Sequence, residues 1–135
     1  DAREMDVAGG EQDCNLGHFK VMIRARHVDM VQPDLMYNGG LIRALRVAQM
    51  AAEGGLRVTP HSPKHNPELA TLLHFGSVVK HTGPFLEFPP RPVSYEDWYE
   101  PHFTIAEGGF IDVPTGPGLG ITYDPDIWNE ADLIE

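Results

Sequence analysis

Short runs of apolar residues alternate with amphipathic patterns from residue 7 to about residue 90, as expected for consecutive βα units. Strands are predicted at four places: 7–11, 30–34, 56–61 and 84–88. Helices are predicted between them: 15–25, 41–52 and a third that begins at Pro67-Glu68. This alternation favours a parallel α/β fold.

The pattern changes after residue 90. The remaining sequence contains several glycines and five prolines, namely Pro92, Pro101, Pro114, Pro117 and Pro125. Proline and glycine favour irregular structure and short β pieces over helices. We therefore expect two parts, the βα units over residues 1–90 and a C-terminal extension over residues 91–135 that packs on them.

Each predicted strand carries a polar residue at its end or one residue before it, namely Glu11, Asp34, His61 and Glu87, at separations of 23, 27 and 26 residues. The carboxyl ends of consecutive parallel strands converge over one pocket, so these four side chains should meet at one rim. A carboxylate beside an imidazole would orient the ring, fix its tautomer and raise its basicity. The pair Asp34 and His61 therefore indicates proton transfer.

Each of these residues also has a plainer explanation. Asp34 could stabilise a turn after a proline, and His61 could be a hydrogen-bonded histidine at a strand end. Glu11 and Glu87 could be solvated acids in turns rich in glycine or proline. The regular spacing favours a site over these alternatives. A zinc site is disfavoured, because His74 falls within a predicted amphipathic helix and no cysteine pair accompanies the histidines.

Composition narrows the class of protein. The 135 residues are well short of a complete (β/α)8 barrel, which takes about 250. A net charge of −10 argues against nucleic acid or an anionic membrane as partner, and no apolar run has membrane-spanning length. The single cysteine fits a reducing compartment, and we expect a cytoplasmic protein. The first residues carry neither a signal-peptide core nor an initiator methionine, so we expect a fragment of a longer protein.

Taken together, the motifs resemble those of a known family. They are Gly10-Glu11, Gln32-Pro33-Asp34 with Gly39-Gly40, Thr59-Pro60-His61, Leu86-Glu87, and Val113-Pro114 through Gly120. Over roughly residues 7 to 124 the chain resembles the C-terminal half of an enolase-superfamily barrel, of the mandelate racemase subgroup of the mandelate racemase/muconate lactonizing enzyme family. The resemblance implies half of a TIM-type (β/α)8 barrel, about four βα units with a wrapping C-terminal segment.

The resemblance also implies roles for the four polar residues. Glu11 matches a carboxylate ligand of the family's Mg²⁺, and His61 matches the histidine general acid/base. Asp34 matches the residue that hydrogen-bonds this histidine, and Glu87 the acid that hydrogen-bonds the substrate or its enediolate. A hard cation and hydrogen-bond donors stabilise the dianion formed when a proton leaves the carbon next to a carboxylate.

The implied activity is Mg²⁺-dependent proton abstraction next to a carboxylate, and we expect an acid-sugar dehydratase, a lyase acting on a small carboxylate substrate. A racemase or epimerase of a hydroxy acid is the alternative, and a non-catalytic binding or assembly module is a third possibility. In the family, two further metal ligands, a lysine and a capping domain lie outside the matched segment. The missing N-terminal half of the barrel therefore belongs to the parent protein or to another chain. We also expect a homo-oligomer.

Overall fold

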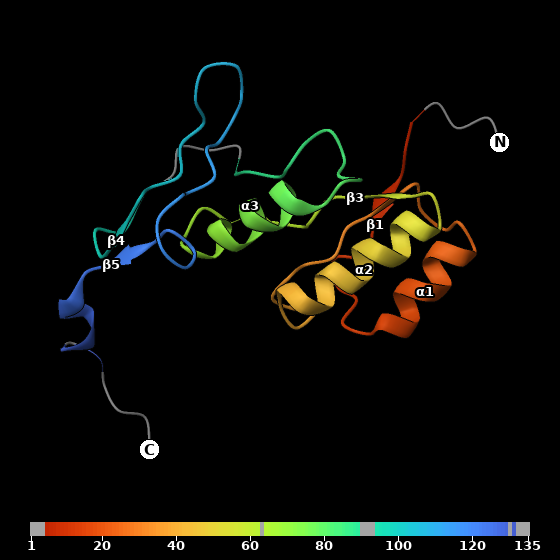
Figure 1. The fold of residues 1–135 in the computed structure, drawn as a ribbon, viewed down its shortest axis with the longest axis horizontal. Helices are drawn as coiled ribbons and strands as arrows, with labels where there is room; N and C mark the ends of the chain where they lie inside the picture. Colours follow the sequence, from red (N-terminus) through yellow and green to blue (C-terminus); the bar gives the residue numbers. More distant parts are fainter. Residues whose placement is uncertain (1–4, 63, 90–93, 130, 132–135) are drawn as a thin grey trace.

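The computed structural model describes residues 5–62, 64–89, 94–129 and 131, and its first part consists of three βα units (Figure 1). In chain order these are β1 (Ala8–Gly9), α1 (Leu16–Arg24), β2 (Met30–Val31), α2 (Leu41–Glu53), β3 (Arg57–Val58) and α3 (Glu68–Val78). The C-terminal part, or tail, holds β4 (Tyr99–Glu100), β5 (Thr122–Tyr123) and the short 3₁₀ helix η1 (Pro125–Trp128). Within the described ranges, no helix is long and apolar enough to cross a bilayer.

The sheet of the first part is parallel, with its strands in the order β1-β2-β3. Met30 aligns with Ala8 on one side and with Arg57 on the other. Regular pairing stops early because Pro33 and Pro60 follow β2 and β3, and proline has no N–H to donate. The ladder resumes in a single parallel bridge between Asp34 and His61, where the His61 N–H donates to the carbonyl of Pro33 at 3.0 Å.

The prediction of a fourth strand over 84–88 is wrong. The chain instead pairs with β3 just before this segment, in one parallel bridge between Val58 and Thr82. Val58 donates to the carbonyl of His81 at 2.9 Å and accepts from Gly83 at 3.0 Å. The next donor from the β3 side would be residue 60, which is a proline without an N–H, so the ladder ends before the apolar run begins.

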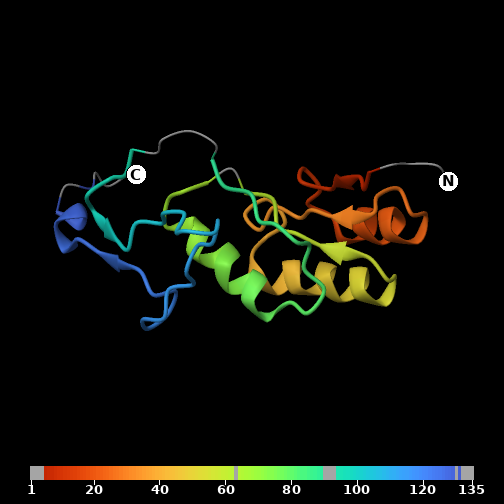
Figure 2. The same cartoon turned by 90° about the horizontal axis from the view of Figure 1, so that it is seen from above.

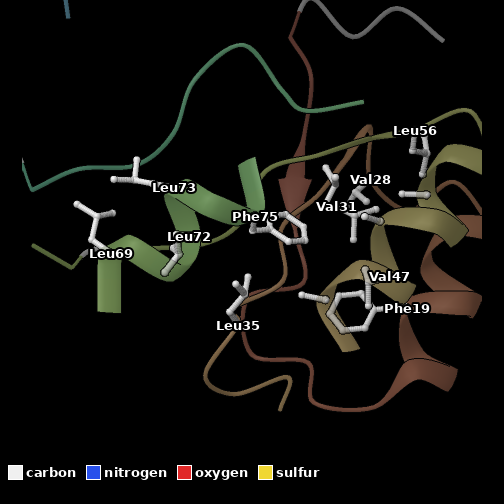
Figure 3. Close-up of a cluster of buried hydrophobic side chains, with 14 of the residues drawn as sticks. Phe19, Val28, Val31, Leu35, Val47, Leu56, Leu69, Leu72, Leu73 and Phe75 are labelled. Atoms are coloured by element: carbon white, nitrogen blue, oxygen red, sulfur yellow. The ribbon is translucent and has the colours of Figure 1, made fainter. Parts of the chain in front are cut away.

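The three predicted helices are confirmed, and α1 and α3 each bury large apolar side chains. Figure 3 shows Phe19 from α1 and Phe75 from α3 in a cluster with β-strand and loop residues. Asn15 caps α1, because its side chain accepts from the Gly17 N–H at 2.7 Å. In α2 the small residues Ala44 and Ala51 are buried, whereas the larger Ile42 is 73% exposed.

The tail extends from the end of the molecule opposite the N-terminus (Figures 1 and 2). Its β4 and β5 pair antiparallel, which agrees with the short β pieces expected after residue 90. Phe103 is buried in the same core as the helices, and the carbonyl of Leu119 lies 3.2 Å from the His74 ring on α3. The predicted division at residues 90 and 91 lies outside the described residues.

Candidate active site

The three short parallel strands direct their polar end residues toward one edge. Glu11 follows β1, Asp34 follows β2 and His61 follows β3. Because the strands are neighbours in this order, their carboxyl ends lie side by side. Glu87 comes from the segment that follows the bridge at Thr82. The structure thus brings together all four residues that the sequence singled out.

Asp34 is almost completely buried and uses both carboxylate oxygens. One oxygen, Oδ1, accepts the backbone N–H groups of Met36 at 2.8 Å and Tyr37 at 3.0 Å. The other, Oδ2, lies 3.2 Å from Nδ1 of His61. Asp34 therefore stabilises a turn and contacts the histidine at the same time, so the two explanations offered by the sequence are compatible.

This geometry assigns the tautomer of His61. A carboxylate oxygen can only accept, so Nδ1 of His61 carries the proton that is donated to Asp34. The second ring nitrogen, Nε2, is left facing two other acids, with Oε2 of Glu11 at 3.5 Å and Oε2 of Glu87 at 3.8 Å. His61 can therefore take up or release a proton at Nε2 while Nδ1 stays bonded to Asp34.

Glu87 is held by a contact that the sequence analysis missed. Its Oε2 accepts the backbone N–H of Ser62 at 2.7 Å, a short distance typical of a charge-assisted bond. Ser62 is itself buried, and its hydroxyl accepts the N–H of Lys64 at 3.2 Å. The only available signal was that Ser62 directly follows His61, since a backbone donor leaves no trace in residue type.

Lys64 brings a positive charge close to these acids. Its ammonium group contacts the carboxylate of Glu68, the first residue of α3. The hydrogen bond with Glu68 raises the pKa of Lys64 above its ordinary value of 10.5, and the charge of Asp34 adds to this effect. Lys64 is therefore a cation at neutral pH, near a rim that is otherwise acidic.

The described residues do not form a metal site by themselves. The Glu11 side chain is 48% exposed and offers one oxygen ligand of the kind that Mg²⁺ prefers. Across the described parts of the chain, however, no group of three or more His, Cys, Asp or Glu side chains is arranged to hold a metal ion. Beside Glu11 lies an open hollow of about 500 Å³ that residues 8–13 line. Further ligands would have to enter from that side.

A second hollow borders Glu87 but is unsuited to a polar ligand. Its volume is about 550 Å³ and it lies among α3, residues 82–88 and residues 105–113 of the tail. Most of its walls are apolar, with Leu73, Phe88 and Val113 among them. Its apolar walls distinguish this hollow from the rim at His61, where the charged side chains lie.

A family model matches most of the chain. Residues 1–127 match the family described as "Enolase C-terminal domain-like". Among characterised proteins, D-galactonate dehydratase of Ralstonia pickettii is 30% identical over 138 residues. That alignment covers 97% of this chain but 34% of the dehydratase, so the chain spans about a third of the length of this relative.

Solved structures show the same partial coverage. A protein assigned as a racemase from Roseobacter denitrificans is 37% identical with a TM-score of 0.83, over 91% of this chain and 35% of its own. An enolase from Pantoea ananatis, with bound D-gluconate and Mg, has a TM-score of 0.77 at 20% identity. Its alignment covers 96% of this chain and 31% of that protein, and at this identity it supports the fold alone.

Proposed function

This chain belongs to the enolase C-terminal domain-like family, and we propose that it carries the acid/base side of a site that dehydrates an acid sugar. Its fold is part of the TIM-type barrel of that family. The observation that carries the proposal is the contact of 3.2 Å between Asp34 and Nδ1 of His61. With Nδ1 so occupied, Nε2 of His61 is the atom that exchanges a proton with the substrate.

The reaction requires two bond changes in a 2,3-dihydroxy acid. The proton on carbon 2 leaves to a base, and the hydroxyl on carbon 3 departs with a proton as water. The resulting enol rearranges to a 2-keto-3-deoxy acid, so one water molecule is lost overall. We assign to His61 the proton that the departing hydroxyl receives. Asp34 stabilises the charged ring before that transfer.

Glu87 and Glu11 flank the reacting nitrogen of His61. We propose that Glu87 hydrogen-bonds the substrate, with its orientation fixed by the Ser62 N–H. We propose Glu11 as one ligand of a Mg²⁺ ion, as the family resemblance implies, with the remaining ligands supplied from outside the described residues. When bound, this cation would stabilise negative charge on the substrate carboxylate.

One relative supports a substrate class. D-galactonate dehydratase of Ralstonia pickettii, at 30% identity, is named for a sugar acid. That acid carries hydroxyl groups on carbons 2 and 3, which the dehydration needs. We therefore propose a sugar acid of this type as substrate. The other two thirds of the relatives' length would provide the missing barrel half and capping domain, and a homo-oligomer stays a prediction.

A racemase or epimerase is the second candidate, because the Roseobacter protein, at 37% identity, is assigned as a racemase. In that reaction a base on the opposite face of the substrate removes the proton, and His61 returns one to carbon 2. The two reactions differ in product. Dehydration yields a 2-keto acid, whereas racemisation introduces solvent deuterium at carbon 2 and keeps the 3-hydroxyl group.

The test is a His61→Asn variant of the whole protein, assayed with Mg²⁺ on a panel of sugar acids in deuterated water. We expect the rate of 2-keto acid formation to fall at least about 100-fold, the contribution typical of a general acid or base. His27→Asn is the matched control, since His27 is an exposed residue between α1 and β2, and it should keep full activity.

Other outcomes decide among the alternatives. Unchanged turnover in His61→Asn would remove this residue from the mechanism. Deuterium incorporation without 2-keto acid would favour the racemase. If the unaltered protein turned over none of the acids, a binding or assembly role would replace the proposed activity.

A further inference from the structure

The loop between β3 and α3 is held at the active site by two hydrogen bonds. Ser62 donates its N–H to Glu87 at 2.7 Å, and the hydroxyl of Ser62 accepts the N–H of Lys64 at 3.2 Å. The first bond joins the start of the loop to one of the four residues of the site, and the second is made within the loop. Any change in the path of this loop would therefore move the donor that orients Glu87.

The far end of the same loop is held by the tail. The hydroxyl of Tyr99 donates to the carbonyl of His65 at 3.3 Å. Tyr95 meets the His65 ring edge-on at a centroid distance of 6.0 Å, and His102 stacks on Tyr95 at 4.8 Å. We name the three tail residues Tyr95, Tyr99 and His102 the aromatic clamp.

The clamp is fixed by its own surroundings. Tyr99 is 2% exposed and belongs to β4, which pairs with β5. The Tyr95 hydroxyl donates to the carbonyl of Phe103, whose side chain is buried in the main core. A buried tyrosine hydroxyl needs a hydrogen-bond partner, and in the structure that partner is the loop carbonyl. The clamp therefore connects the core to the loop.

We propose that Tyr99 is a positioning residue of the active site. Through the carbonyl of His65, its hydroxyl holds this end of the loop and keeps the Ser62 N–H directed at Glu87. The role of Glu87 rests on the proposed function, whereas the coupling between tail and loop does not. The tail is thus a structural support of the site as well as a covering for α3.

The test follows the Ser62 amide by NMR in the ¹⁵N-labelled whole protein. Glu87→Gln provides the reference, because it removes the charge from the acceptor and shifts the Ser62 resonance. In Tyr99→Phe, which keeps the ring and removes the hydroxyl, we expect this resonance to move toward the reference position. We also expect its hydrogen exchange to be about fivefold faster, as for the loss of one ordinary hydrogen bond.

Trp98→Phe is the matched control in the same strand region. Trp98 packs on Tyr99 and stacks on Tyr123, so the variant perturbs the tail without removing the hydroxyl. The Ser62 amide should be unchanged in this variant. An unchanged Ser62 amide in Tyr99→Phe would overturn the proposal, and so would an equal change in both variants, because general packing would then explain it.

A second variant covers the case in which Tyr99→Phe does not fold. His65→Ala keeps the backbone carbonyl that Tyr99 bonds and removes only the ring that Tyr95 contacts, so exchange at Ser62 should be unchanged. An acceleration in this variant would overturn the proposal, because ring packing rather than the carbonyl contact would then hold the loop. In an active protein, Tyr99→Phe should lower kcat more than it changes KM. A protein without activity toward sugar acids but with coupled amides would contradict the proposed function and leave the coupling intact.

Discussion

The βα units and the tail of this molecule are held together in different ways. All residues of the main core except Phe103 lie between Phe19 and Phe75, within the βα units. The tail leaves several large apolar side chains exposed, among them Phe110 and Trp128, each at 72%. Its order comes from aromatic pairs and one short antiparallel ladder. A continuous core thus supports the first region, and a few local contacts support the second.

The difference matters for the site. Glu11, Asp34 and His61 all stand at strand ends of the well-packed region, so their geometry depends on the core. Glu87 lies beyond the last bridge of the sheet, and its orientation depends on a loop that the tail contacts. One side of the site is therefore rigidly supported, and the other depends on the weaker region.

Removal of one large aromatic side chain from each region tests this comparison most strongly. Phe19 is fully buried, so Phe19→Ala should reduce the free energy of unfolding by about 3–5 kcal/mol through lost burial and a new cavity. Trp128→Ala removes an even larger but exposed side chain, and its effect should stay within about 0.5 kcal/mol. Urea denaturation measures both. Similar losses in the two variants would contradict the contrast between the regions.

Two glycines near the hollow beside Glu87 sharpen the comparison at the boundary. A Cβ at Gly83 would overlap the hydroxyl of Thr59 and lie 2.7 Å from Sδ of Met30, so Gly83→Ala should cost about 1–3 kcal/mol of unfolding free energy. At Gly76 the nearest atom is Cδ1 of Leu86 at 3.3 Å, the end of a flexible side chain.

Gly76→Ala is therefore the control, because alanine also favours the helix by up to about 1 kcal/mol. Thermal and urea unfolding should show no loss of stability in this variant. If both substitutions reduced the free energy of unfolding equally, the close contact of Gly83 with Thr59 and Met30 would not be the cause of the loss.

The smallest expected effect concerns the tail at alkaline pH. Burial raises the pKa of Tyr99 above its ordinary value of 10.0, because the charged phenolate is poorly solvated there. The neutral form of Tyr99 is thus favoured in the folded protein. Its contribution to the free energy of unfolding is complete below pH 10.0 and is lost as the pH rises through the pKa of the folded state.

The free energy of unfolding should therefore fall more steeply above pH 10.0 in the unaltered protein than in Tyr99→Phe. Lys64 titrates in the same range in both proteins, so the difference between their pH profiles isolates Tyr99. Parallel profiles would show that Tyr99 is not buried in solution, which would weaken the aromatic clamp as well.

The fold was largely predictable where the periodicity of apolar residues and the positions of proline and glycine indicate the same element. Leu69, Leu72 and Phe75 recur at helical spacing, and all three are buried in α3. The apolar run at 84–88 was misleading, because composition favours a strand there while Pro60, beside it after β3, has no N–H to donate to it. In α2 the spacing of apolar residues predicted the helix but not its buried face. Close packing between helices there selects small residues such as Ala44, while the larger Ile42 is exposed.

The family resemblance and the grouping of the four polar residues were both available from the sequence. Family membership is confirmed by the match over residues 1–127. The spacing of the first three strand ends sufficed to place Glu11 beside His61, because parallel strands share an edge. Glu87 also lies beside His61, although it follows a single bridge at Thr82 and not a strand. The Ser62 donor and the clamp on His65 were not predictable, because backbone groups and loop paths carry no residue-type signal. The roles of the four residues stay predictions.

The pairing of Asp34 with His61 across the sheet ties the chemistry to strand alignment. These two residues are partners in the ladder itself, joined by a backbone bridge as well as by their side chains. An insertion of one residue between β3 and His61 would turn the imidazole to the opposite face of the sheet. Replacing a side chain can weaken the pair, but only a change in chain length can relocate it. A segment from a homologue can therefore replace this one without loss of the pair only if it keeps the same number of residues between β3 and His61.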